Sequence, residues 1–141
     1  MFALTQGDVT ESEKSLQQML DIQVEIVEAL RLSYRVLDMA TEELGAAAYR
    51  KYDIEVWMPS KGGYGEISSA SNCTSYQARR LNICYLDNHN EKKLAHTING
   101  TALAVPRIIQ TILETNYDEA SETVLMPECL LPWLPFDKIT Q

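Results

Sequence analysis

Residues 52–74 read YDIEVWMPSKGGYGEISSASNCT, and they predict the central element of the fold. Residues 52–58 predict a strand. Residues 59–63 are a cluster of turn-forming residues, and residues 64–71 return as a second strand. The pattern therefore predicts an antiparallel hairpin in the middle of the chain.

A long amphipathic helix is predicted upstream of the hairpin, after a short strand at residues 2–5. Thr10 followed by Glu13 forms a capping box, in which the hydroxyl accepts a backbone N–H and the carboxylate reaches back to the cap. Apolar residues then recur at helical spacing to about Leu32, and Gln23 is the single polar break in that stripe. We expect this helix to pack against the sheet and to carry no chemistry.

The remaining segments complete an α+β pattern. Residues 34–40 predict a strand and residues 43–49 a helical turn, both before the central hairpin. Residues 82–86 and 94–98 flank a polar turn and predict a second hairpin. The predicted fold class is one α+β unit, in which helices flank an antiparallel sheet.

The end of the chain predicts a helix followed by an irregular coat. The helix is expected over residues 101–115, and Pro106 inside it is expected to bend the axis because proline removes one hydrogen bond. Residues 127–136 are rich in Pro and Leu and predict a segment without regular structure. The expected buried residues of the helix are Leu103, Ile108, Ile109, Ile112 and Leu113.

Composition and charge exclude several classes of protein. Of 141 residues, 45% are hydrophobic and 23% charged, which is typical of a globular domain and does not favour disorder. The net charge of −8, from 20 acidic and 12 basic residues, argues against this piece binding a nucleic-acid backbone by itself. No apolar run approaches the roughly 18–20 residues of a membrane span, so no membrane partner is expected.

The cysteines do not form a recognisable framework. Cys73, Cys84 and Cys129 are widely spaced and include no CxxC pair, so reduced thiols are expected. A zinc site made from Cys73, Cys84, His89 and His96 is disfavoured, because their spacing does not match that of structural zinc sites.

Two segments together resemble the seryl-tRNA synthetases, a class II family. Residues 52–59 (YDIEVWMP) lead into residues 66–74 (EISSASNCT) and 77–80 (QARR), and residues 96–107 read HTINGTALAVPR. They resemble the YDIEVW strand, the EISSxSNC strand and the third class II motif, NGTxxAVxR. The third motif alone is weak evidence, but the three in this order narrow the resemblance to the serine enzyme. The similarity extends over nearly the whole chain.

The resemblance implies ATP, Mg²⁺ and serine as ligands and suggests a role for each matching residue. Arg107 would be the catalytic residue and would hold the γ-phosphate of ATP, a task that suits an always-charged fork of donors. Glu66 and Ser69 would bind ATP through the oxygen ligands that they offer to its Mg²⁺. Asn99 and Thr101 would face the serine, and a hydroxyl partner can reject the analogue without a hydroxyl by about 10⁴-fold.

Each of these residues also has a purely structural interpretation. Arg107 could be a solvated surface residue, Glu66 a cross-strand partner of Lys61 or Arg80, and Thr101 a helix cap. The joint pattern of the motifs favours the functional interpretation. Packing roles are expected for neighbours on the same strands, namely Asp53, Glu55, Trp57 and Tyr64.

The resemblance also implies which part of a synthetase this chain is. Residues 1–141 would be the C-terminal half of the class II catalytic domain, with the third motif at 96–107 and without the N-terminal tRNA-binding arm and the first two motifs. The implied activity is serine–tRNA ligase, which makes seryl-adenylate from serine and ATP and transfers serine to tRNA-Ser. That tRNA would bind through parts not present in this chain, and the family forms homodimers.

Two kinds of product remain open at this point. The chain is either a fragment of a working ligase or a non-catalytic, truncated relative that binds ATP or pairs with a full-length synthetase. We expect the isolated chain not to make adenylate, because loss of a transition-state charge contact typically costs ~10²-fold or more. We also expect exposed sheet edges to cause aggregation.

Three local features resemble the animal mitochondrial branch of the family. They are Ala70, the AVPR ending at Arg107, and the closing residues 136–140 (FDKIT). The expected location is therefore the mitochondrial matrix, and otherwise the cytoplasm.

Overall fold

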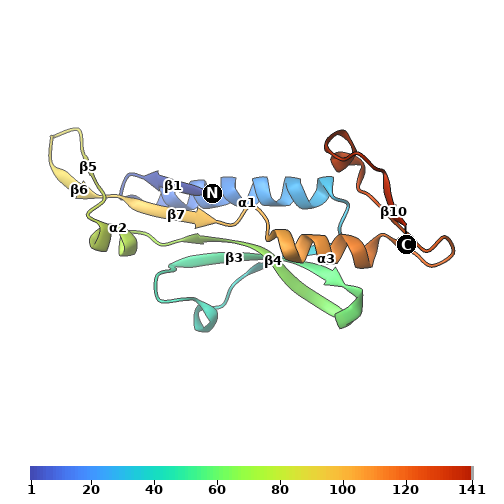
Figure 1. Cartoon of the computed structure of the whole chain (residues 1–141). Helices are drawn as coiled ribbons and strands as arrows, with labels where there is room; N and C mark the ends of the chain where they lie inside the picture. Colours follow the sequence, from blue (N-terminus) through green and yellow to red (C-terminus); the bar gives the residue numbers. More distant parts are fainter. Residues whose placement is uncertain (141) are drawn as a thin grey trace.

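The computed structural model describes residues 1–140 and places a long helix along an antiparallel sheet (Figure 1). The sheet has five strands in the order β1-β7-β4-β3-β2, and all neighbours are antiparallel. Its strands are β1 (Phe2–Thr5), β2 (Tyr34–Asp38), β3 (Arg50–Met58), β4 (Gly63–Asn72) and β7 (His96–Gly100). The predicted α+β class and the central hairpin, now β3 and β4, are confirmed.

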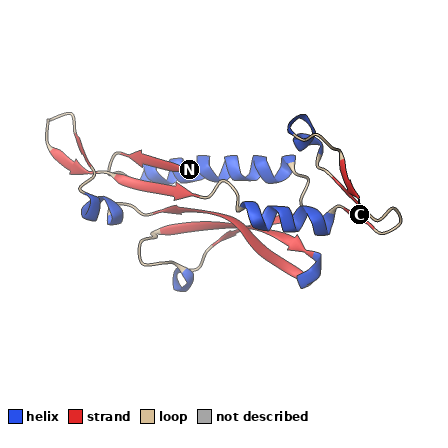
Figure 2. Cartoon of the chain, viewed as in Figure 1, coloured by secondary structure: helices blue, strands red, loops and turns tan. Residues whose placement is uncertain are grey.

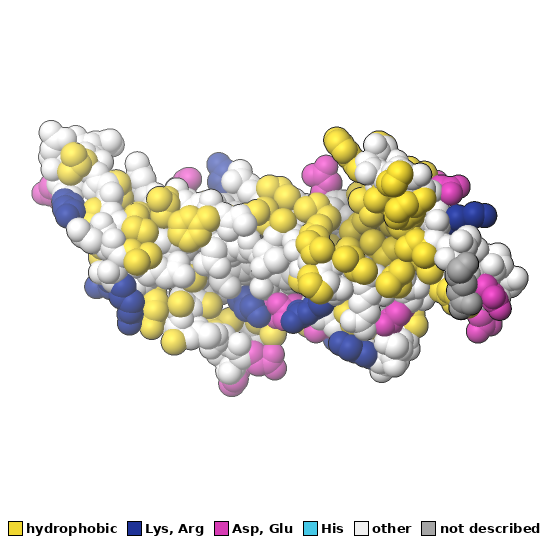
Figure 3. All heavy atoms as spheres, in the orientation of Figure 1, with side chains coloured by type: hydrophobic (Ala, Val, Ile, Leu, Met, Phe, Trp, Pro, Cys, Tyr) yellow, Lys and Arg dark blue, Asp and Glu magenta, His cyan; other side chains and the backbone are white. Residues whose placement is uncertain are grey.

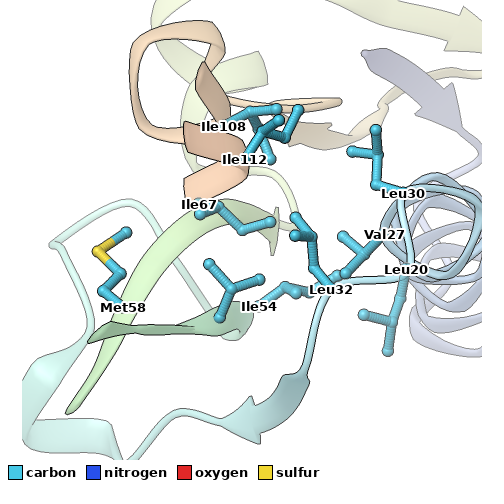
Figure 4. Close-up of a cluster of buried hydrophobic side chains, with 10 residues drawn as sticks. Leu20, Val27, Leu30, Leu32, Ile54, Met58, Ile67, Ile108 and Ile112 are labelled. Atoms are coloured by element: carbon cyan, nitrogen blue, oxygen red, sulfur yellow. The ribbon is translucent and has the colours of Figure 1, made fainter. Parts of the chain in front are cut away.

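One face of the sheet is covered and apolar. Helices α1 (Val9–Ala29) and α3 (Val105–Thr115) lie on the same side of β3 and β4 (Figure 2). Figure 4 shows how their side chains meet those of the strands in one buried cluster. The cluster comprises Leu20, Val27, Leu30, Leu32, Ile54, Val56, Met58, Ile67, Ile108 and Ile112. This burial holds the helices against the sheet, because each apolar side chain removed from water stabilises the fold by about 1.5–3 kcal/mol.

The start of α1 differs from the predicted capping box. The helix begins at Val9, and its cap is Asp8, whose side chain accepts a hydrogen bond of 3.0 Å from the backbone N–H of Glu11. Thr10 lies inside the first turn, so the expected cap at Thr10 is wrong. Asp8 has the extended backbone that a cap requires, and Glu13 is occupied elsewhere, by hydrogen bonds from β3 and β4. The helix ends at Ala29.

The second predicted hairpin is only half right. Strands β5 (Cys84–Leu86) and β6 (Lys92–Leu94) pair with each other, but the segment expected to continue to residue 98 divides at Ala95. Strand β7 then joins the main sheet between β1 and β4, because its Ile98 is buried under α1. A short helix, α2 (Tyr76–Leu81), was not predicted, since six residues are too few to show a periodicity.

The predicted bend at Pro106 is wrong. Helix α3 begins at Val105, which places Pro106 in its first turn, where no intrahelical N–H is lost. Ile108 and Ile112 are buried as expected, whereas Ile109 and Leu113 are exposed. Figure 3 shows hydrophobic side chains gathered over α3 and the C-terminal segment.

The two remaining segments are more regular, or differently placed, than predicted. The tail contains a three-stranded sheet of β8 (Tyr117–Asp118), β9 (Thr123–Leu125) and β10 (Lys138–Thr140), with a 3-10 helix at Glu128–Trp133. The helical turn expected over residues 43–49 is a 3-10 turn at Thr41–Glu43, and another such turn, Pro59–Lys61, closes the central hairpin. Within residues 1–140, no helix has the length and apolarity that crossing a membrane requires.

Candidate functional site

A β-bulge in β4 creates the candidate site on the open face of the sheet. The pairing of β3 with β4 shifts between Ile54 and Glu55, so that Ile67 is an extra residue in β4. In a regular strand, residues three apart point to opposite faces. The bulge instead places Glu66 and Ser69 on the same open face, while Ile67 stays fully buried in the core.

Four of the five predicted site residues surround one depression. Glu66 and Ser69 from β4, Thr101 after β7 and Arg107 from α3 line an open hollow of about 310 Å³. Ile67 and Ser68 of β4, with Ala104 and Pro106 at the start of α3, complete its lining. The structure therefore brings together residues that are up to 41 positions apart in the chain.

The Arg107 side chain is tethered to β4. Its Nη1 donates a 2.7 Å hydrogen bond to the backbone oxygen of Glu66 and lies 3.6 Å from the carboxylate of the same residue. Both side chains remain substantially exposed, at 52% and 39%, so the ion pair is worth at most about 1 kcal/mol and an anion could replace it. Glu66 is thus paired with Arg107, and the alternative of a partner at Lys61 or Arg80 is wrong.

The backbone at Thr101, where the chain leaves the sheet, lies close to the backbone of β4. Its N–H donates to the Ser69 carbonyl at 3.0 Å, one residue beyond the last β7–β4 pair, Gly100 with Ala70. A Cβ at Gly100 would lie 2.9 Å from the Ser69 oxygen, so glycine is needed for this contact. Thr101 is not a helix cap, because α3 starts four residues later.

Asn99 occupies a neighbouring part of the same face. It lies opposite Ser71 of β4, and its Nδ2 is 3.5 Å from Sγ of Cys73. It lines a second depression of about 330 Å³, together with Lys51, Gln77 and the Gly45–Ala48 segment. The structure therefore does not place Asn99 in the same hollow as Thr101.

The family described as tRNA synthetase class II core domain (G, H, P, S and T) matches residues 3–116. The chain belongs to this family. It is similar in sequence to named serine–tRNA ligases and in structure to seryl-tRNA synthetases, which confirms the resemblance noted from the motifs.

Three relatives show how far the similarity extends. The chain is 49% identical over 140 residues to the mitochondrial serine–tRNA ligase of Mus musculus, covering 99% of this chain and 27% of that protein. It is 48% identical over 134 residues to the serine–tRNA ligase of Rubrobacter xylanophilus, covering 95% and 31%. The seryl-tRNA synthetase of Pyrococcus horikoshii, solved in complex with ATP, matches with a TM-score of 0.91 at 40% identity, covering 99% and 31%. The chain thus spans less than a third of the length of these relatives.

The oxygen donors in the hollow of this class II core suit a Mg²⁺ ion that arrives bound to a nucleotide. No three His, Cys, Asp or Glu residues within 1–140 are grouped so as to hold a metal ion by themselves. Mg²⁺ usually binds through one or two carboxylates together with substrate phosphates, rather than in a cage made of protein alone. The Glu66 carboxylate and the Ser69 hydroxyl face one hollow and provide that kind of partial ligand set.

Sequence reasoning assigned Asp53 to packing only, although it lies on the open face of this synthetase core beside the site. It pairs in register with Ser69 of β4, and its carboxylate is 2.7 Å from Nζ of Lys51. Burial raises the pKa of Asp53, and the ion pair with Lys51 opposes this rise. The period of two in β3 was the signal that could have found it, since Asp53 and Glu55 share one face.

Proposed function

We propose that this chain is part of a serine–tRNA ligase and binds ATP, Mg²⁺ and serine on the open face of its sheet. The observation that carries the proposal is the bulge at Ile67, which turns Glu66 and Ser69 into the hollow that Arg107 and Thr101 also line. The similarity to serine–tRNA ligases, and to a seryl-tRNA synthetase solved with ATP, supports the same activity.

Each residue has a role that its chemistry suits. Arg107 holds the γ-phosphate, because a guanidinium exchanges its exposed contact with Glu66 for a stronger bidentate contact with phosphate. Glu66 and Ser69 offer oxygen ligands to the Mg²⁺ on the nucleotide. Thr101 contacts the serine, and its hydroxyl selects for the substrate hydroxyl, while Asn99 would contact the serine from the neighbouring depression. The positive charge of Arg107, together with that of the Mg²⁺ that Glu66 and Ser69 would hold, stabilises the transition state as the serine carboxylate attacks the α-phosphate and pyrophosphate leaves.

The proposal extends to the larger enzyme. In it, the 141 residues form the C-terminal half of a class II catalytic domain, and tRNA-Ser is the acceptor bound by other parts of the protein. The working enzyme is a homodimer. The relatives support the view that this chain corresponds to part of a longer protein, since it spans 27% to 31% of their length.

We further propose that the protein works in the mitochondrial matrix. Relatives from Mus musculus and Bos taurus, 49% and 47% identical, are mitochondrial serine–tRNA ligases, although bacterial ligases are equally similar. An antibody against this chain should detect it in the matrix fraction of disrupted cells. Its appearance only in the cytosolic fraction would contradict this part of the proposal.

The direct test is binding of MgATP to the 141-residue chain, measured by saturation-transfer NMR. Arg107→Ala should weaken binding at least about tenfold while leaving the unfolding curve nearly unchanged, because the arginine is half exposed. Arg79→Ala, on α2 and outside the hollow, is the matched control and should bind as the parent does. Equal binding by the parent chain and Arg107→Ala would refute the assignment.

Two further measurements test Mg²⁺ binding and the activation of serine separately. Glu66→Gln, which keeps the side-chain shape, should abolish the gain in ATP binding that Mg²⁺ gives to the parent chain. Serine-dependent exchange of labelled pyrophosphate into ATP then reports activation itself. Exchange that needs serine and vanishes in Arg107→Ala would show that these 141 residues suffice, whereas binding without exchange would limit them to holding the ligands.

A further inference from the structure

We propose that Gln23 is a positioning residue, which sets the spacing between Ser69 and Thr101 from the covered side of the sheet. Its Nε2 donates to the backbone oxygen of Ser69 at 2.9 Å and to that of Thr101 at 2.7 Å. These carbonyls belong to the residues assigned to Mg²⁺ and to serine, so the inference rests on the proposed function.

Gln23 lies beneath the point where the chain leaves the sheet. The β7–β4 ladder ends at Gly100, and the following residues turn toward α3 without strand pairing. In this segment the relative position of β4 and Thr101 is not set by a regular ladder. Backbone bonds from Thr101 N–H to the Ser69 oxygen and from Ala104 N–H to the Ile67 oxygen join this segment to β4, and the Gln23 amide adds a further link from α1, which is itself anchored in the core.

The two carbonyls do not need Gln23 in order to be satisfied. The Ser69 oxygen also accepts from the N–H of Thr101 at 3.0 Å, and the Thr101 oxygen also accepts from the hydroxyl of Ser68. Neither group would be left without a partner if the amide were absent. The amide therefore adds geometry, namely a second bond on each oxygen that links them through one nitrogen.

Packing alone does not account for a glutamine at this position. The side chain is fully buried, and its Oε1 has no hydrogen-bond partner among residues 1–140. A buried polar atom without a partner destabilises the folded state, whereas the neighbouring core positions of α1 are apolar. These neighbours are Leu16, Met19, Leu20 and Val27. An apolar side chain of similar length would avoid the cost, so we attribute the glutamine to its hold on the site.

The test compares Gln23→Met with the parent chain. Methionine keeps the length and volume of the side chain and removes both donors, so the urea midpoint should not fall. Amide hydrogen exchange at Thr101 should become at least about tenfold faster while exchange at Ile54 stays unchanged, and MgATP binding should weaken about 10- to 100-fold, as is typical when a supporting contact of a site is removed.

The matched control is Gln18→Met, on the exposed side of the same helix. It should change neither exchange at Thr101 nor MgATP binding. Unchanged exchange and unchanged binding in Gln23→Met would overturn the inference, and so would a lower urea midpoint with faster exchange throughout, which marks a general structural role. If the parent chain binds no MgATP, the proposed function fails, but the exchange at Thr101 still decides whether Gln23 positions this segment.

Discussion

The two faces of the five-stranded sheet come from the same strands but have different environments. On the covered face, Ile54, Val56 and Met58 of β3 pack beneath α1 and α3. On the open face, Asp53 and Glu55 of the same strand stand beside the candidate site, and none of the helices within residues 1–140 lies over that part. Alternation along one strand thus separates the residues that form the core from those beside the candidate site, so most changes should affect either stability or the proposed ligand binding and spare the other.

Each face of the sheet also contains polar side chains that are buried. The covered face contains a buried cluster in which Asn72 donates to the hydroxyl of Ser12 at 3.0 Å, and His96 lies 3.1 Å from the same hydroxyl. The open face contains Asp53, which is only 5% exposed. Buried polar groups need partners wherever they lie, and within residues 1–140 the Asn72, Ser12 and His96 side chains satisfy one another, whereas Oε1 of Gln23 has no partner.

The largest expected effect is on the covered face. Ile54→Ala should lower the free energy of unfolding by about 2–5 kcal/mol, because it leaves a cavity in a fully buried position. Trp57→Ala on the open face removes a larger side chain, but one that is 41% exposed and packs edge-on against Tyr64. Its cost should be about 1 kcal/mol. Urea denaturation measures both, and equal losses would contradict the division between the faces.

The next largest effect is expected at Gly100, the last residue of β7. Gly100→Ala should cost about 1–3 kcal/mol, because the new methyl group would meet the backbone of Ser69 and Ala70 within 3.2 Å. It should also weaken MgATP binding by displacing Thr101. Gly45→Ala is the control, since no atom lies within 4 Å of its added Cβ, and it should change stability by no more than about 1 kcal/mol.

The cap of the covering helix gives a smaller effect. Asp8→Ala should destabilise the chain by about 1 kcal/mol, through loss of its bond to the N–H of Glu11. Thr10→Ala should stay within about 0.5 kcal/mol, as an exposed residue inside the helix. If thermal unfolding showed a larger loss for Thr10→Ala than for Asp8→Ala, the capping box predicted from the sequence would be correct after all.

The smallest effect should come from the buried carboxylate of the open face. Burial raises the pKa of Asp53 above its ordinary value of 3.8, so the folded state binds this proton more tightly than the unfolded state. Its contribution to stability is present below that ordinary value and is lost as pH rises through the raised pKa. The stability of the parent chain relative to Asp53→Asn should therefore increase between about pH 7 and pH 4. A difference that is flat or decreases over this range would contradict the raised pKa.

The sequence predicted the elements with strong local patterns and missed those set by distant contacts. The β3–β4 hairpin and α1 follow from periodicity, and both are confirmed. The partner of residues 96–98 was wrong, because burial of Ile98 under α1 and pairing with β1 and β4 outweigh the neighbouring hairpin. The cap and the bend at Pro106 were wrong because each depended on where a helix begins, and a shift of a few residues changes the outcome.

The candidate site divides in the same way. The family resemblance identified Glu66, Ser69, Asn99, Thr101 and Arg107 as a set, and all of them except Asn99 line one hollow. Spacing could not show that Asn99 lies in a neighbouring depression, nor that Gln23 reaches two of their carbonyls from below. Those facts depend on strand order and on the packing of α1.

The sequence by itself determined the fold class, the family resemblance and the identity of most candidate site residues, because side-chain periodicity and motif order are properties of the chain. Only the tertiary structure decided that Glu66 and Ser69 face the same way, since residues three apart in a strand otherwise point to opposite sides. That outcome required one residue, Ile67, to be taken into the core as a bulge. Its burial is set by α1, α3 and β3 together, and no local pattern encodes that arrangement.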